Sequence, residues 1–134
     1  MRGGLVIIAL MLLMACGGEL KSPTYPREVA GGPAVPVFKL NSELVLTSDQ
    51  VPVHVPAAGL VRAVRITYDG SNALQLICFE TKSSSVAFEA LQKWRPEEGR
   101  RASQVGRYFI VAQMEKPDPK TLDTFLTGFE KQLQ

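Results

Sequence analysis

Two runs of alternating apolar and polar residues, joined by a turn sequence, give the clearest pattern in the chain. Residues 60–68 alternate as a half-buried strand does, and residues 73–80 are apolar enough for a returning strand. The four residues between them, Asp-Gly-Ser-Asn, are a turn signal. The pattern therefore predicts a β-hairpin over residues 60–80. Its alternation assigns Val64, Ile66 and Tyr68 to one face and Ala63, Arg65 and Thr67 to the other.

Helical spacing follows the hairpin. Residues 83–94 carry apolar side chains at helical intervals after a run of serines, one of which is expected to cap the helix. Arg95 precedes Pro96 and is therefore disfavoured in helical geometry, so the helix should end there. The predicted apolar stripe consists of Ala87, Phe88, Leu91 and Trp94.

A second helix is predicted at the end of the chain. Asp118 is a suitable cap, and Pro119 suits the first turn, where its missing N–H costs nothing. Apolar residues then recur every three or four positions, which indicates a helix lying on a sheet. That stripe consists of Leu122, Phe125, Leu126, Phe129 and Leu133.

Two further extended segments complete the predicted fold. Residues 51–56, "VPVHVP", alternate, but their prolines cannot donate to a ladder, so an edge strand is expected. Residues 104–114 predict a third core strand. The order β-β-β-α-β-α indicates an α+β fold, a two-layer sandwich in which a small, mainly antiparallel sheet packs both helices on one face.

The N-terminal apolar run is not expected to belong to the folded domain. Residues 5–16 are apolar without interruption, follow Arg2 and precede two glycines. A membrane-spanning helix needs about 20 apolar residues, so this run is short for one and matches a secretory signal. An uncleaved N-terminal anchor is the alternative. We expect an exported protein.

The end of this run resembles the lipobox of bacterial lipoprotein precursors. Leu13-Met14-Ala15-Cys16 has an aliphatic residue three positions before the cysteine and a small one just before it, although Met14 is bulkier than usual. The resemblance implies that Cys16 receives a diacylglycerol, that cleavage occurs before it, and that its new amine is acylated. Gly17 in place of Asp implies the outer membrane facing the periplasm. The alternative is an ordinary signal cleaved after Gly17, with Cys16 incidental.

The chain then divides into three parts. Residues 1–15 are the predicted signal peptide, and residues 16–36 are a lipidated cysteine with a flexible tether rich in proline and glycine. Residues 37–134 form a single α+β domain. Its second half also resembles small uncharacterised exported bacterial domains, a resemblance that implies no activity.

Composition excludes some functions. The chain has 15 basic and 13 acidic side chains, a net charge of +2, which gives no electrostatic footprint for nucleic acid. His54 is the single histidine and is expected to face solvent, and no catalytic motif or metal-ligand spacing is present. Cys78 lies in the apolar run "LQLICFE", where a buried, inert thiol is expected and a reactive thiol or an intermolecular disulfide is the alternative. We therefore expect no cofactor, no metal and no catalytic residue.

One charge cluster is a candidate binding surface. The segment "KWRPEEGRRASQVGR" carries the densest basic charge, beside an aromatic side chain. It could bind an anionic ligand, an acidic partner or lipid headgroups, or it could be a solvated loop with local ion pairs. The candidate residues are Trp94, Arg95, Arg100, Arg101 and Arg107.

These observations give a functional hypothesis. We expect a lipid-anchored protein of the bacterial cell envelope, held by membrane lipid on Cys16, whose non-catalytic domain binds an envelope protein or a small ligand. The alternatives are a secreted soluble binding domain without lipid and a small envelope enzyme with an unrecognised site.

Overall fold

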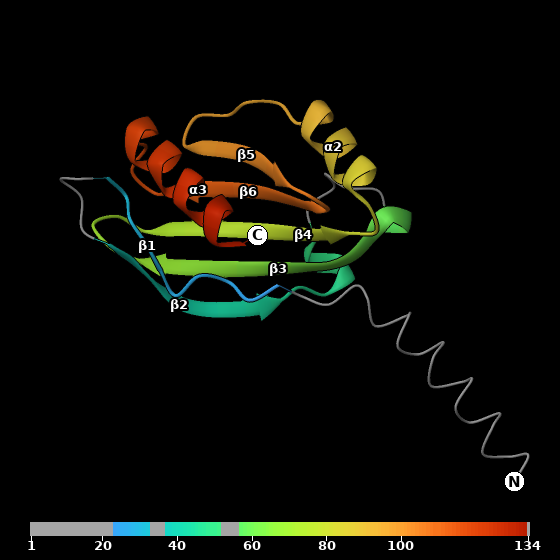
Figure 1. Ribbon diagram of the computed structural model, residues 1–134, viewed down its shortest axis with the longest axis horizontal. Helices are drawn as coiled ribbons and strands as arrows, with labels where there is room; N and C mark the ends of the chain where they lie inside the picture. The colour runs from blue at the N-terminus through green and yellow to red at the C-terminus, as the bar shows by residue number, and fades with distance from the viewer. Residues whose placement is uncertain (1–22, 33–36, 52–56, 134) are drawn as a thin grey trace, which may run out of the picture.

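An antiparallel sheet dominates the molecule (Figure 1). The computed structural model describes residues 23–32, 37–51 and 57–133. Within these ranges the sheet has six strands in the order β1-β2-β3-β4-β6-β5, and each neighbouring pair is antiparallel. The elements are β1 (Glu28–Val29), β2 (Phe38–Val45), β3 (Leu60–Asp69), β4 (Leu74–Thr81), α2 (Ser84–Lys93), β5 (Arg100–Val105), β6 (Tyr108–Met114) and α3 (Pro119–Leu133).

The predicted central hairpin is confirmed. Strands β3 and β4 pair over their whole length, from Leu60 opposite Thr81 to Tyr68 opposite Leu74. The two faces also follow the predicted alternation. Val64, Ile66 and Tyr68 lie in one core cluster, and Ala63 lies in another.

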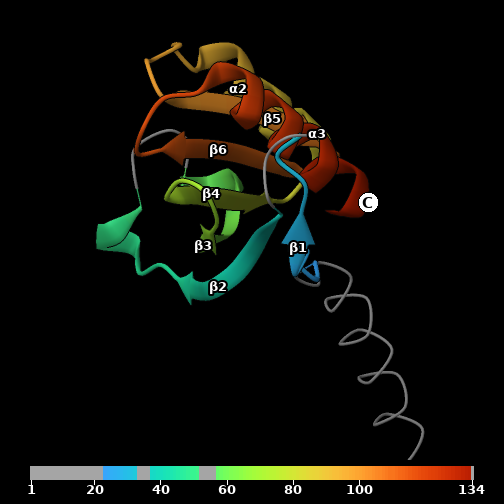
Figure 2. The same cartoon turned by 90° about the vertical axis from the view of Figure 1, so that its left-hand side faces the viewer.

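The predicted two-layer sandwich is wrong. The described residues contain more sheet than expected. This sheet curls, so that its edge strand β1 lies beside α3 (Figure 2). The helices do not share a face. In β6, Ile110 packs in the cluster that contains α3, whereas the adjacent residues Phe109 and Val111 pack in the cluster that contains α2. Because neighbouring residues of a strand point to opposite faces, α2 and α3 cover opposite faces of the sheet.

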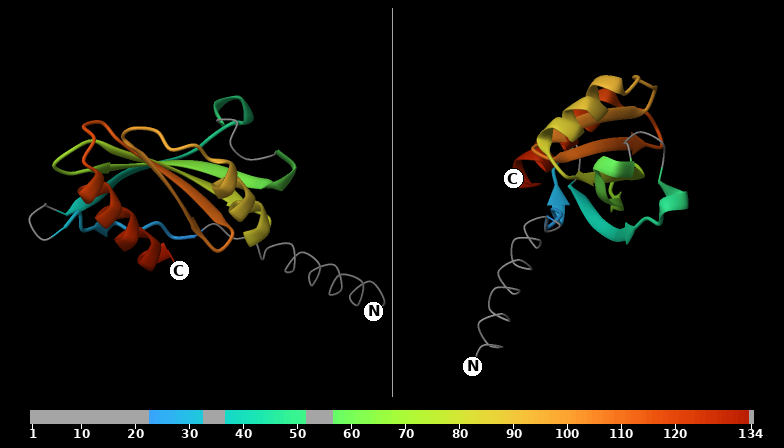
Figure 3. Two further views of the ribbon diagram at one scale, coloured as in Figure 1. Left: turned by 90° about the horizontal axis from the view of Figure 1, so that it is seen from above. Right: turned by 90° about the vertical axis from the view of Figure 1, so that its right-hand side faces the viewer.

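We name these two sides the α3 face and the back face. Seen from above, α3 and α2 lie on either side of the β5–β6 hairpin (Figure 3). The sequence pattern could not show this, because an amphipathic stripe indicates that a helix packs but not on which side of a sheet.

The segment expected to be one core strand over 104–114 is a hairpin. Strand β5 ends at Val105 and β6 begins at Tyr108. Gly106 makes the turn with φ of 54°, a left-handed conformation that glycine adopts without steric cost. Strand β5 itself was not predicted, because Arg100–Val105 is mostly polar and lies at the sheet edge.

Part of the predicted tether belongs to the folded domain. Tyr25 is 4% exposed and Val29 is fully buried. Backbone pairing joins β1 to β2, and the Tyr68 hydroxyl donates to the Pro26 carbonyl at 2.7 Å. The expectation of a flexible tether up to residue 36 is therefore wrong for residues 23–32, which we call the strap.

Other predictions fall partly or wholly outside the described residues. These include the signal peptide, Cys16 and His54. Of the predicted strand 51–56, only Val51 is described, and it follows a 3-10 turn at Ser48–Gln50. The strand in this part of the fold is β2, which the sequence pattern did not indicate.

Both helices begin and end close to the predicted positions. Ser83 caps α2 by accepting a hydrogen bond from the Val86 N–H, and the helix ends before Arg95. The predicted stripe of α2 is partly wrong, because Phe88 is 50% exposed while Ala90 is buried. In α3 the entire predicted stripe is buried: Leu122, Phe125, Leu126, Phe129 and Leu133.

Candidate functional site

A row of polar side chains crosses the back face at right angles to the strands. Ser42 lies opposite Thr67, Thr67 opposite Gln75, Gln75 opposite Gln113, and Gln113 opposite Arg100. Partners in register point to the same face, so one residue from each of β2, β3, β4, β6 and β5 contributes to the row. We name this set the polar row.

The polar row borders a hollow in the surface. The hollow has a volume of about 560 Å³, and its lining includes Asn41, Thr67, Asp69, Gln75 and Gln113. A smaller hollow of about 390 Å³ shares Asp69 with it and continues to the β3–β4 turn. The larger volume lies in the range of ligand-binding pockets.

Hydrogen bonds hold the rim of the hollow in place. The Asn72 side chain donates to the Lys116 carbonyl and accepts from the Lys116 N–H, which ties the β3–β4 turn to the end of β6. The Asn41 amide donates to the Asp69 carboxylate at 3.3 Å. These hydrogen bonds fix the positions of the rim residues relative to one another.

Three side chains that line the hollow have hydrogen-bonding groups without a partner among the described residues. The side chains of Gln75, Gln113 and Glu115 make no hydrogen bond or ion pair with any other described residue, whereas Ser42 and Thr67 bond to each other. Each glutamine amide can donate two hydrogen bonds and accept two. These groups are available to a ligand.

The next row along the strands is apolar except for one arginine. Leu44, Arg65, Ile77, Val111 and Ala102 are in register across β2, β3, β4, β6 and β5. The Arg65 Nε is buried and has no hydrogen-bond partner in the described part of the chain. Beyond this row, α2 covers the back face, so the open part is the half toward the β3–β4 turn.

The structure disperses the basic cluster that the sequence singled out. Arg100 belongs to the polar row and forms an ion pair with Glu97 at 3.0 Å. Trp94 ends α2 and packs against the back-face core, and Arg95 is exposed beyond it.

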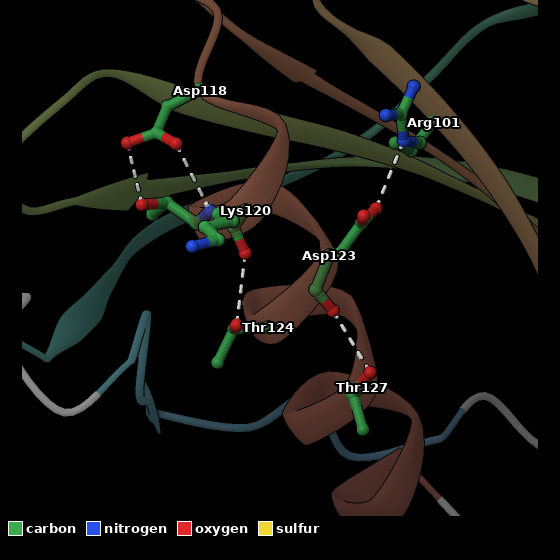
Figure 4. A network of polar contacts seen from close by, with 7 residues as sticks. Arg101, Asp118, Lys120, Asp123, Thr124 and Thr127 are labelled. Atoms are coloured by element: carbon green, nitrogen blue, oxygen red, sulfur yellow. Dashed lines mark hydrogen bonds and ion pairs between the residues drawn. The ribbon is translucent and has the colours of Figure 1, made fainter.

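The remaining two arginines lie elsewhere. Arg101 points to the α3 face, where its Nε donates to the Asp123 carboxylate at 3.0 Å (Figure 4). Arg107 lies at the opposite end of β5 from Arg100, about 17 Å along the strand, and its Nη1 donates to the Thr81 carbonyl. These five residues therefore do not form one surface.

The α3 face contains a buried polar cluster instead of an open site. The Glu80 carboxylate is 1% exposed and accepts hydrogen bonds from the Tyr25 hydroxyl at 2.8 Å and from Arg62 at 3.3 Å. Cys78 is fully buried, and burial raises the pKa of its thiol to about 12. A thiol with this pKa is almost entirely protonated at neutral pH, so Cys78 is suited to packing and not to nucleophilic attack.

The described ranges contain neither a metal-binding cluster nor a membrane-spanning helix. No group of three His, Cys, Asp or Glu side chains there is arranged to hold a metal ion. No helix among those residues is long and apolar enough to cross a membrane.

The sequence analysis missed the polar row for a physical reason. Its members lie on five strands between positions 42 and 113, and only strand register brings them together. The alternation of β3 gives part of the signal, because it places Thr67 on the face opposite Val64, Ile66 and Tyr68. Comparison with known proteins adds no family: no family model, curated protein or solved structure matches this chain.

Proposed function

We propose that this chain is a lipid-anchored protein of the bacterial cell envelope whose domain binds a polar ligand on its back face. The single observation that supports binding is the hollow beside the polar row, where Gln75, Gln113 and Glu115 have no partner among the described residues. The hollow has the volume of a ligand-binding pocket, and its mainly polar lining can form hydrogen bonds with a polar ligand. The proposed role is recognition without catalysis.

The lipobox resemblance supports the location. The strap shortens the length of chain between Cys16 and the folded domain, because the domain already begins at the strap. Eight residues, 17–24, separate Cys16 from the buried Tyr25, which makes nine steps along the chain. Fully extended, nine steps span about 30 Å at most. An acylated Cys16 would therefore hold the domain near the membrane surface.

The position of the strap also orients the domain. Tyr25 bonds to Glu80 on the α3 face, while Gln75, five residues earlier in β4, lies on the back face. The tether thus joins one face, and the hollow opens on the other. In this arrangement the hollow is accessible from the side away from the anchor.

Metabolic labelling tests the anchor. Cells that express the wild-type chain are grown with labelled palmitate, beside cells that express Cys16→Ala or Cys78→Ala. We expect label on the wild type and on Cys78→Ala, and none on Cys16→Ala. An unlabelled wild type would contradict the lipoprotein proposal and favour a secreted domain.

A pull-down tests the binding role. The bait is the wild-type chain, a Gln113→Arg variant that fills the hollow, or a Gln92→Arg control on the exposed side of α2. We expect molecules captured from envelope extracts by the wild type and the control to be lost from Gln113→Arg. Identical capture by all three baits would show that the hollow does not bind them.

A further inference from the structure

The hydrogen-bonding groups around the hollow indicate the chemistry of its ligand. We infer that the hollow binds a neutral, hydroxyl-rich glycan, lying across the strands along the polar row. This inference rests on the proposed binding function and adds the ligand class to it.

The first argument is the mixture of donors and acceptors. Of the side chains that line the hollow, Asp69 and Glu115 offer carboxylates that only accept, whereas Gln75 and Gln113 both donate and accept. A sugar hydroxyl both donates and accepts, so a polyol can satisfy all these groups at once. A ligand with acceptors alone, such as a phosphate, could not donate to the Glu115 carboxylate.

The second argument is charge. The carboxylates Asp69 and Glu115 of the hollow are balanced by Lys116 in the adjoining hollow and by Arg65 in the next row, and Arg100 of the polar row is paired with Glu97. The surroundings are thus close to neutral. An anion would be repelled by Asp69 and Glu115, and a strongly cationic ligand would meet Arg65 and Lys116.

The third argument is the arrangement of the amides. Gln75 and Gln113 lie directly opposite each other on adjacent strands, and Thr67 stands next to Gln75 in the same row. Neighbouring strands are spaced about 4.8 Å apart. The row therefore presents hydrogen-bonding groups at regular intervals, which suits a chain of repeating polar units. On one side of it, the half-buried Ile77 offers apolar surface to the less polar face of a sugar ring.

Titration with defined sugars tests the inference. The wild-type chain, purified in detergent, is titrated with tri-N-acetylchitotriose or with maltotriose while its amide spectrum is recorded by NMR. We expect saturable shifts at the side-chain amides of Gln75 and Gln113. Binding of the first sugar alone would identify acetamido glycans, and binding of both would identify neutral glycans generally.

Variants establish where the sugar binds. Gln75→Ala combined with Gln113→Ala removes the two side-chain amides that are proposed to hydrogen-bond the sugar, so the affinity for the sugar should fall about tenfold or more. The control Gln92→Ala should bind as the wild type does. Gln113→Glu, which preserves side-chain size, is a second variant if the double substitution perturbs the amide spectrum, and it should also weaken binding.

Two outcomes would overturn the inference. The first is no binding of either sugar at millimolar concentration, or binding that the glutamine variants do not weaken. The second is saturable binding of an oligoalanine peptide at Gln75 and Gln113, which would assign the hollow to a peptide. If Gln113→Arg still abolishes capture from envelope extracts while no sugar binds, the binding role stands and only the ligand class fails.

Discussion

The α3 face and the back face belong to the same strands but are covered to different extents. On the α3 face, Phe125 of α3 meets Phe38 and Tyr68 edge-on, with ring centroids 5.5 and 5.0 Å away, and the strap closes over the remaining area. On the back face, the short helix α2 packs through Ala87 and Ala90 and leaves the polar row open. The α3 face is thus largely closed by aromatic packing, whereas half of the back face keeps an open polar region.

The largest test of this comparison removes an aromatic ring from the α3 face. Phe125 is fully buried, and Phe125→Ala should lower the free energy of unfolding by about 3–5 kcal/mol, because the ring leaves a cavity behind. The matched control is Phe88→Ala on the exposed side of α2, which should change it by less than about 0.5 kcal/mol. Urea unfolding followed by circular dichroism measures both. Equal losses would mean that α2 matters as much as α3.

The strap is the next test. Tyr25→Phe retains the ring packed on Phe129 but removes the hydroxyl that donates to the buried Glu80 carboxylate. Leaving a buried acceptor short of a donor should cost about 1–3 kcal/mol. Hydrogen exchange should accelerate at the Leu40 N–H, which bonds to the Arg27 carbonyl of the strap. Unchanged stability and exchange would show that this bond does not hold the strap.

Alkaline pH should weaken the α3 face selectively. Burial raises the pKa of the Cys78 thiol from 9.0 to about 12, so above pH 9 the unfolded chain releases this proton while the folded chain retains it. Stability is therefore complete below pH 9 and falls as the pH rises toward 12. Burial also raises the pKa of Tyr25 and Tyr68, which adds to the loss above pH 10.

The expected size of this effect is measurable. Between pH 8 and pH 10, in a Cys16→Ala background, the free energy of unfolding should drop by about 1–2 kcal/mol. In the Cys78→Ala variant the drop should be smaller, whatever its stability at pH 8. A drop of equal size in both variants would show that the thiol does not contribute.

The sequence revealed the α3 face far better than the back face, and the reason is physical. Burial on one side of a helix or strand leaves a local periodic pattern, as the stripe Leu122, Phe125, Leu126, Phe129 and Leu133 does. The central hairpin was predictable for the same reason. The strap was not, because Tyr25 and Val29 stand isolated among prolines and glycines, and β2 was missed because most of its residues are exposed.

The candidate site was unpredictable for a further reason. The basic residues Arg100 and Arg101 are neighbours in sequence, yet they point to opposite faces of β5 and bond to Glu97 and Asp123 respectively. Proximity along the chain suggested a surface that the strand geometry separates. Conversely, Gln75 and Gln113 are far apart in sequence, and strand pairing places them side by side.

The smallest expected effect concerns the polar row itself. Gln113 is exposed, and neither its amide nor that of Gln75 has a partner among the described residues, so Gln75→Val combined with Gln113→Val should change the free energy of unfolding by less than about 0.5 kcal/mol. Valine suits a strand as well as glutamine does or better, and a small gain is within expectation. Urea unfolding measures this change, and Phe125→Ala, unfolded under the same conditions, is the reference for a large loss. A loss above 1 kcal/mol would assign the row a structural role, whereas near-neutral stability would show that the fold does not need these amides.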